Sequence, residues 1–242
     1  MQVLYEDNHI IIVNKAPGEI VQGDKTGDKP LSDILKDWLK EKYNKPGDAF
    51  VGVVHRLDRP VGGIVIFAKT SKALSRLNAM LRDGLIHKTY WAISRNKPAK
   101  SEDSLTHYIT STERNNKSYA SDTPKRGAKE ARLHYRVIAQ GDNYTLLEVK
   151  LLTGRKHQIR VQLSAIGCPI KGDLKYGDRR SNPDGSISLL ARRIEFEHPV
   201  SHKTIDITAP VPEDTLWQAL ENTAAQNVAA EYNDNTQSNE NE

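Results

Sequence analysis

The sequence contains a single cysteine, Cys168, among its 242 residues. One cysteine excludes an internal disulfide and a zinc-finger cluster. No stretch approaches the roughly 18 consecutive apolar residues that a membrane-spanning helix requires. The N-terminus, MQVLYEDNHIIIVNK, has only a five-residue apolar run and lacks the basic start of a secretory signal. We therefore expect a globular domain in a reducing compartment, and the cytoplasm fits.

Basic residues outnumber acidic ones in the body of the chain. The whole sequence has 35 Lys and Arg against 31 Asp and Glu, and a net charge of +4. Residues 222–242 hold four of the acids and no Lys or Arg, so the remainder carries 35 bases against 27 acids, or +8. Such a surplus favours a polyanionic partner, most commonly nucleic acid, although charge alone does not establish one.

The hydrophobic pattern predicts short strands interspersed with helices. Strands are expected at 9–13, 64–68, 88–94, 131–139, 144–152, 189–199 and 203–210, and helices at 30–45, 71–84, 157–167 and 213–222. The polar, basic segment 95–130 is expected to form a long loop, and the polar segment 223–242 a disordered tail. Together these elements predict one α+β domain over residues 1–222, with a largely antiparallel or mixed sheet flanked by helices.

An aspartate stands between two arginines at the start of an apolar strand. The stretch VVHRLDRPVGGIVIFAKT (53–70) places His55, Arg56, Asp58 and Arg59 directly before that strand. A lone aspartate at such a point is most simply a residue that caps or stabilises a turn. The alternative is that Asp58 has a chemical role at the end of the strand.

A basic cluster occurs at a second junction, where a strand leads into a helix. The segment TGRKHQIR (153–160) contains Arg155, Lys156 and Arg160 together with His157. A helix start surrounded by cations suits a phosphate or a carboxylate. Taken alone, the segment is equally compatible with an ordinary basic helix.

The two segments together resemble the RluA family of pseudouridine synthases. The order is HRLD, a Gly-containing turn and an apolar strand, then KTYWA, LLTGRKHQIRVQL and GCPIKGDLKYG, and the resemblance spans residues 8–210. Residues 59–62 are Arg-Pro-Val-Gly where the family commonly has Asp-Thr-Ser-Gly, and Lys156 replaces a usual Thr or Ser. The S4 RNA-binding module that many relatives carry ahead of the core is not expected, since the motifs begin near Met1.

The resemblance implies that the chain isomerises uridine to pseudouridine in ribosomal or transfer RNA. It implies base flipping, no cofactor, no metal and a monomeric enzyme whose partner is RNA. The implied catalytic residues are Asp58 as the family's aspartate, Tyr90 of KTYWA as its active-site tyrosine, and Arg160 as the partner that keeps Asp58 charged. The implied RNA-binding residues are Arg56, which enters the RNA stack, with His55, Leu152, Arg155 and Lys156.

Several alternatives remain open on the residues alone. The chain could be a non-catalytic RNA-binding protein on the same fold, or a hydrolase that uses Asp58 on a glycosidic bond. Glycoside hydrolysis normally needs two carboxylates, and no second acid stands out, because Asp173 looks structural. Tyr90 could be an ordinary core residue. His55 and His157 lack the spacing of metal ligands, so structural or RNA-contacting roles are expected for both.

Overall fold

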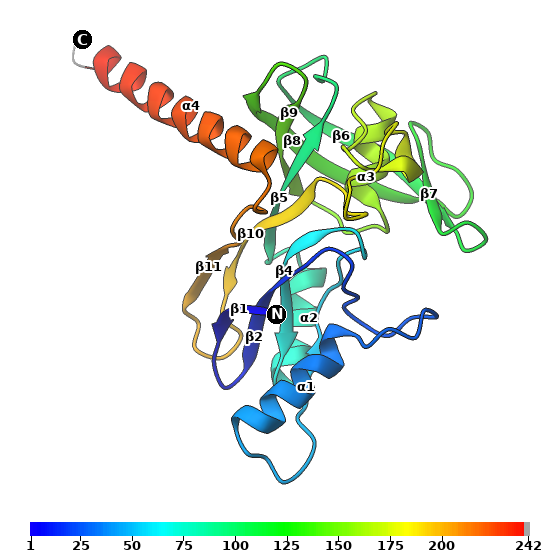
Figure 1. Cartoon of the computed structure of the whole chain (residues 1–242), viewed down its shortest axis with the longest axis vertical. Helices are drawn as coiled ribbons and strands as arrows, with labels where there is room; N and C mark the ends of the chain where they lie inside the picture. The colour runs from blue at the N-terminus through cyan, green and yellow to red at the C-terminus, as the bar shows by residue number, and fades with distance from the viewer. Residues whose placement is uncertain (240–242) are drawn as a thin grey trace.

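The computed structural model describes residues 1–239, and the surroundings of side chains up to residue 230. Its centre is one mixed sheet with the strand order β1-β2-β4-β10-β5-β9-β8-β6-β7, in which β3 also pairs with β4 and β11 with β10 (Figure 1). The strands are β1 Gln2–Glu6, β2 Ile10–Lys15, β3 Gly52–Val53, β4 Gly62–Ala68, β5 His87–Ser94, β6 Glu102–Thr112, β7 Lys117–Ser121, β8 Lys129–Gln140, β9 Thr145–Leu151, β10 Leu189–Glu197 and β11 Thr204–Thr208. The predicted α+β class with a largely antiparallel sheet is confirmed.

The pairing of β4 with β10 is parallel, whereas the other pairings of the sheet are antiparallel. The two strands meet at Gly62 and Gly63, opposite Leu190 and Ala191. Gly63 has a φ of +110°, and a Cβ atom there would lie 2.4 Å from the carbonyl oxygen of Ala191. Only glycine permits this close approach. The loop that precedes β4 therefore ends in the middle of the sheet.

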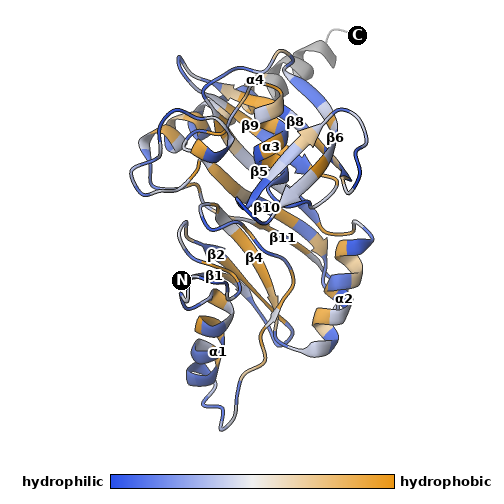
Figure 2. Cartoon of the chain, turned by 90° about the vertical axis from the view of Figure 1, so that its right-hand side faces the viewer, coloured by the Kyte–Doolittle hydropathy of each residue, from blue (hydrophilic) through white to orange (hydrophobic). Residues whose placement is uncertain are grey.

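Among the described residues, four α-helices accompany the sheet: α1 Leu31–Lys42, α2 Ser71–Arg82, α3 Gln158–Ala165 and α4 Thr215–Asn239. Helices α1 and α2 pack on opposite sides of β2 and β4. Alternate residues of these strands contact each helix: Ile11, Val13, Val65 and Phe67 join the cluster of α1, and Ile10, Ile12, Ile64 and Ile66 that of α2. Burial on both sides explains why both strands are continuous apolar runs (Figure 2).

The segment 95–130 is not the long loop that its composition predicts. Strands β6 and β7 form a hairpin from it, paired from Tyr108–Ser121 to Thr112–Lys117. Only alternate residues of β6, among them Leu105, His107 and Ile109, are buried, and the residues between them face solvent. The prediction failed because a strand with one buried side carries too few apolar residues to stand out from a polar loop.

The expectation of a helix that ends at residue 222 was also wrong. Helix α4 continues to Asn239, and Ala224, at 6% exposure, packs with Trp217 and Leu220. The Asn227 side-chain amide donates to the Ile138 carbonyl at 2.9 Å. The sequence AAQNVAA is rich in the strongest helix former, which favours continuation of the helix. The end of the predicted disordered tail, residues 240–242, lies outside the described residues.

Within the described part of the chain, none of the helices is both long and apolar enough to cross a membrane.

Candidate active site

The structure brings together the two segments that the sequence singles out. Asp58 lies in the loop between β3 and β4, and Arg160 in the first turn of α3, 102 residues later. Nη1 of Arg160 donates to Oδ2 of Asp58 at 2.9 Å. The Arg160 side chain is 6% exposed, whereas that of Asp58 is 29% exposed. An arginine at this depth orients the carboxylate from behind and leaves the carboxylate open to solvent.

Arg160 is held by a second carboxylate on its other side. Its Nε and Nη2 atoms donate to the two oxygens of Asp173 at 2.7 and 2.9 Å, and the Asp173 side chain is only 1% exposed. Burial would lower the pKa of Arg160, but the hydrogen bonds and charge of Asp173, and then those of Asp58, raise the pKa above its ordinary value. A bidentate pair of this kind fixes both the charge and the plane of the guanidinium.

Asp173 bears on the glycoside-hydrolase alternative. It is a second acid close to the Asp58 site, but both of its oxygens bind Arg160 and it does not line the cavity beside Asp58. Two carboxylates that flank a bond must both face the substrate. The geometry gives Asp173 a structural role, as expected from the sequence.

His157 lies beside Asp58 in an uncommon backbone conformation. Its φ is 55°, in the left-handed region, directly before α3. Its Nδ1 is 2.7 Å from the Tyr176 hydroxyl, and its Nε2 is 3.7 Å from Oδ2 of Asp58. Burial lowers the pKa of His157 to about 4, although the charge of Asp58 opposes this shift, so the ring is neutral at neutral pH. Sequence reasoning missed Tyr176.

A cavity of about 80 Å³ opens beside Asp58. Its apolar lining is formed by Leu57, Val61, Tyr90, Leu151, Ile159 and Leu189. The predicted Tyr90 is buried on β5, and its hydroxyl has no hydrogen-bond partner among the described residues. Burial, and then the charge of Asp58, raises the pKa of Tyr90, so the phenol stays protonated. The cavity therefore offers a flat apolar wall, one hydroxyl and one carboxylate.

The predicted RNA-binding residues divide between the cavity and its surroundings. Arg56 and Arg155 are exposed at its mouth, and Nε of Arg155 donates to the Glu130 carbonyl at 2.8 Å. Lys156 is exposed but does not line the cavity. Two exposed guanidinium groups thus lie at the opening of the cavity that contains Asp58.

The other two predicted RNA-binding residues do not line the cavity. Leu152 is 60% exposed, whereas its neighbour Leu151 faces the cavity, because successive residues at the end of a strand point in opposite directions. Nε2 of His55 accepts the backbone N–H of Ile66 at 3.2 Å. Burial, aided by the charge of Lys88, lowers the pKa of His55 to about 3, which keeps that acceptor available.

A buried lysine supports the loop of Asp58 from the other side. Nζ of Lys15, which is almost completely inaccessible, donates to the carbonyl groups of Ala16, Arg59 and Val61 at 2.9, 3.1 and 2.7 Å. Burial lowers the pKa of Lys15 to about 8. The lysine thus ties the residues that follow Asp58 to the end of β2.

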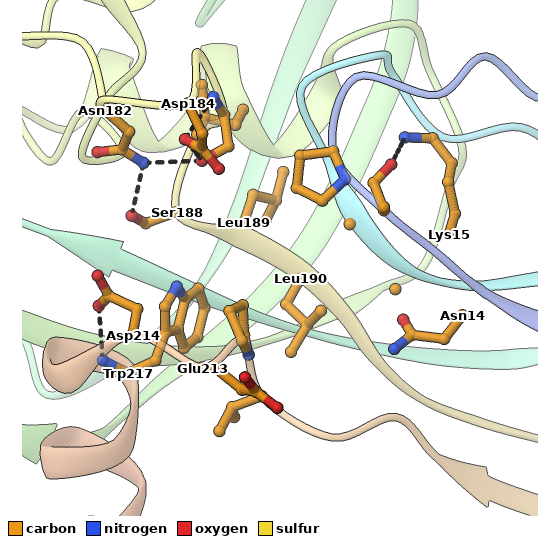
Figure 3. Close-up of a pocket in the computed structure, with 18 of the residues that line it drawn as sticks. Asn14, Lys15, Asn182, Asp184, Ser188, Leu189, Leu190, Glu213, Asp214 and Trp217 are labelled. Carbon is orange, nitrogen blue, oxygen red and sulfur yellow. Dashed lines mark hydrogen bonds between the residues drawn. The ribbon is translucent and has the colours of Figure 1, made fainter. Parts of the chain in front are cut away.

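A larger cavity, of about 670 Å³, lies between the start of the chain, the segment that leads into β10 and the start of α4 (Figure 3). Asn14, Asn182, Leu190 and Trp217 are among the residues around it. It contains none of Asp58, Tyr90, His157 and Arg160. No cluster of three or more potential metal ligands occurs in the described part of the chain. The residues that the sequence predicts to be catalytic therefore lie at the smaller cavity and not at the larger one.

Comparisons with known proteins agree with the motifs. A family model described as RNA pseudouridylate synthase matches residues 9–165. The uncharacterized RNA pseudouridine synthase YlyB of Bacillus subtilis is 31% identical over 225 residues, which cover 92% of this chain and 72% of that protein. The ribosomal large subunit pseudouridine synthase D of Zymomonas mobilis is 32% identical, over 88% of this chain and 70% of its own.

Solved structures share the fold. The human RNA pseudouridylate synthase domain containing 4 superposes with a TM-score of 0.74 at 23% identity, over 88% of this chain and 89% of that one. With the match to the family model and the curated relatives, the resemblance to the RluA-type enzymes is confirmed. The chain belongs to the RNA pseudouridylate synthase family, and it is an isomerase that converts uridine to pseudouridine in RNA.

Proposed function

We propose that the chain modifies a uridine of ribosomal or transfer RNA, with Asp58 as the catalytic carboxylate and the uridine flipped into the cavity beside it. Some relatives are named for ribosomal RNA and others for transfer RNA. One is the ribosomal large subunit pseudouridine synthase D of Zymomonas mobilis, and another is the tRNA pseudouridine synthase C of Pectobacterium carotovorum. The observation that carries the proposal is the position of Asp58, half-buried, anchored by Arg160 and open to an apolar cavity that contains Tyr90.

The chemistry needs no oxidant, reductant or added group. The bond from N1 of uracil to C1′ of ribose breaks, and a bond from C5 to C1′ forms. One proton leaves C5 and one joins N1, so the mass of the RNA is unchanged. An ionised carboxylate can act as a nucleophile on the uridine or support cleavage of the glycosidic bond. Asp58 can serve either role, since Nη1 of Arg160 holds its Oδ2 at 2.9 Å and the carboxylate lines the cavity.

Tyr90 provides the wall against which the extruded base lies. An aromatic ring stacks on a flat base, and a protonated hydroxyl donates a hydrogen bond or takes part in proton transfer. The burial that raises the pKa of Tyr90 favours the donor form. The free hydroxyl described above is available to the base, since it binds nothing else among the described residues.

Base flipping would bring a stacked uridine to this cavity. Asp58 and Tyr90 are recessed in the protein, and the reacting atoms of a stacked uridine lie inside the RNA, so the nucleotide must leave its stack to meet them. Arg56 is exposed at the mouth, where a planar guanidinium can occupy the vacated place in the stack and contact phosphates.

The replacement of Asp58 by Asn tests the proposal, because it is nearly isosteric and removes the charge. We expect Asp58→Asn to lower single-turnover isomerisation by more than about a hundredfold, in the range expected for a lost nucleophile. Folding and RNA affinity should stay close to wild type. Asp206→Asn, which removes an exposed carboxylate paired with Arg193, is the matched control and should retain full activity.

The assay is analysis of the nucleosides released from RNA after incubation with enzyme. Pseudouridine from the wild type and none from Asp58→Asn supports the proposal. Residual turnover above a hundredth of wild type would exclude a direct role for Asp58. Release of free uracil would indicate a hydrolase, and RNA binding without any product would indicate a binding protein. Pseudouridine mapping of cellular RNA with and without the gene then identifies the modified uridine.

A further inference from the structure

His157, like Arg160, contacts both the candidate carboxylate and a network of residues behind it. The ring is buried at the start of α3, with Nδ1 2.7 Å from the Tyr176 hydroxyl and Nε2 3.7 Å from Oδ2 of Asp58. The Tyr176 ring stands edge-on to His157, at 84° and 5.6 Å between centroids. The Arg160 guanidinium lies 5.0 Å from the centre of the same ring. Tyr176 thus packs against both partners of Asp58.

The surrounding hydrogen bonds decide which nitrogen of His157 carries the proton. The backbone N–H of Ser118 donates to the Tyr176 hydroxyl oxygen at 2.8 Å, so the hydroxyl proton is free to point elsewhere. Nδ1 of His157 is the acceptor within reach. If Nδ1 carried the proton, the lone pair of Nε2 would face the negative charge of Asp58. The arrangement in which the Tyr176 hydroxyl donates to Nδ1 and Nε2 carries a proton toward Asp58 avoids this repulsion.

The two oxygens of Asp58 have different surroundings. Nη1 of Arg160 and Nε2 of His157 both approach Oδ2. Oδ1 accepts no hydrogen bond from the described residues. A separation of 3.7 Å is longer than a hydrogen bond, but such contacts in enzymes without substrate are often long and shorten when the site closes.

We infer that His157 is a positioning residue for the isomerisation: Tyr176 holds it as the Nε2–H tautomer, and together with Arg160 it fixes Oδ2 of Asp58 so that Oδ1 faces the uridine. This inference rests on the proposed catalytic role of Asp58. Neither His157 nor Tyr176 touches a reacting atom in this arrangement, and both act through the orientation of the carboxylate.

The same network connects the carboxylate to the hairpin of β6 and β7. Ser118 belongs to β7, and besides its N–H bond to Tyr176 its hydroxyl donates to the carbonyl of Lys156 at 2.8 Å. The residue that follows Lys156 is His157 itself. A shift of this hairpin, whose tip carries Arg114 and Lys117, would therefore reach the imidazole through two hydrogen bonds.

Three variants separate the contacts of the imidazole. In His157→Asn the short amide occupies the place of Nδ1 and nothing reaches Asp58, while asparagine tolerates the left-handed backbone. In His157→Gln the longer amide reaches the place of Nε2 and restores a donor toward Asp58. Tyr176→Phe removes the hydroxyl that selects the tautomer. His202→Asn is the control, because His202 is also left-handed, with a φ of 57°, but is exposed on the turn between β10 and β11.

We expect single-turnover isomerisation to fall about tenfold in Tyr176→Phe and about 10- to 100-fold in His157→Asn, as for other residues that orient a functional group. His157→Gln should recover most of the rate lost in His157→Asn. The Kd for RNA should change less than about twofold, since neither side chain belongs to the exposed basic surface. In wild-type enzyme with ¹⁵N-labelled histidine, NMR at neutral pH should show a protonated Nε2 and an unprotonated Nδ1 on His157.

The results distinguish this inference from the proposed function. If Asp58→Asn is inactive and the three variants match wild type, or if His157→Gln is as slow as His157→Asn, the positioning role is refuted and the role of Asp58 stands. A protonated Nδ1 in the NMR spectrum also refutes the inference, without reference to activity. If Asp58→Asn remains active, the proposed function fails first. Melting temperatures of all variants show whether a slow enzyme is merely an unfolded one.

Discussion

The pair of Asp173 and Arg160 makes the sharpest prediction about stability. Asp173→Asn keeps the volume and shape of the side chain but removes its charge. The wild-type carboxylate accepts two hydrogen bonds from Arg160, at 2.7 and 2.9 Å, and both side chains are more than nine-tenths buried. In the variant an amide NH₂ group replaces one acceptor oxygen and faces a guanidinium N–H, so one of the two hydrogen bonds is lost. Asp58 is then the one remaining carboxylate that binds the buried Arg160 guanidinium among the described residues.

The expected cost follows from the burial. Removal of one partner from a buried ion pair costs about 3–5 kcal/mol, because the other charge stays buried without compensation. Arg160 retains its bond to Asp58, so we expect the lower end, about 3 kcal/mol, which corresponds to roughly a 150-fold change in the unfolding equilibrium. The rate of uridine isomerisation should also fall, because a guanidinium that is no longer anchored by Asp173 does not fix the direction of the Asp58 carboxylate.

The chain contains a matched control for this experiment. Asp206 also binds an arginine through both oxygens, since Nε and Nη2 of Arg193 donate to them at 2.6 and 2.5 Å, but these side chains are 45% and 46% exposed. Exposed pairs contribute about 0–1 kcal/mol, so Asp206→Asn should change stability by less than about 1 kcal/mol. Urea denaturation of both variants measures the difference. Equal losses within about 0.5 kcal/mol would refute the reasoning from burial.

Three further predictions concern charge, pH and the C-terminus. RNA affinity, measured by fluorescence anisotropy, should fall by orders of magnitude between about 50 and 200 mM salt. Lys156→Ala should reduce the slope of log affinity against log salt concentration by about one. An affinity that does not change with salt would contradict an interface with phosphates. The folded-state pKa of His157, about 4, lies below the unfolded value of about 6.5, so protonation of this residue lowers the free energy of unfolding as the pH drops from about 6.5 to 4. His157→Asn lacks this group, so over the same pH range its free energy of unfolding, measured by urea titration, should fall by about 2–3 kcal/mol less than that of wild type. Equal decreases in the two proteins would contradict a buried neutral ring. Truncation after residue 222 should lower the melting temperature by several degrees, about 1 kcal/mol, because it removes buried Ala224 and the Asn227 bond to Ile138. An unchanged melting temperature would show that those contacts contribute nothing.

The parts of the fold that were predictable have strong local signals. β2 and β4 are apolar runs buried on both sides, and α2 has helical spacing and a real N-cap, in which the Thr70 hydroxyl accepts the N–H of Ala73 at 3.2 Å. β1, β6 and β7 were missed although β1 pairs with its neighbour β2 and β6 with its neighbour β7, because each of the three strands has few fully buried residues. Such a strand lacks the apolar run or regular alternation by which a strand is recognised in a sequence.

The candidate site was predictable only in part, and the division has a physical cause. Asp58, Tyr90 and Arg160 stand in motifs whose order resembles a known family. Asp173 and Tyr176 stand in another stretch that carries the resemblance, GCPIKGDLKYG, but nothing in these residues alone shows that they contact Arg160 and His157.

A local signal for the turn that holds Asp173 and Tyr176 is the pair of glycines around it, and both are left-handed, Gly172 with a φ of +88° and Gly177 with a φ of +108°. A Cβ at Gly172 would lie 2.8 Å from the Ser186 carbonyl oxygen, so the chain must pass close to its neighbour there. This bend carries Asp173 and Tyr176 back to α3, where they meet Arg160 and His157. A residue larger than glycine at position 172 should therefore disturb the carboxylate site, although Gly172 itself contacts no part of it. The geometry of Asp58 thus depends on a loop more than a hundred residues away. The motif that contains Asp58 carries no information about that loop.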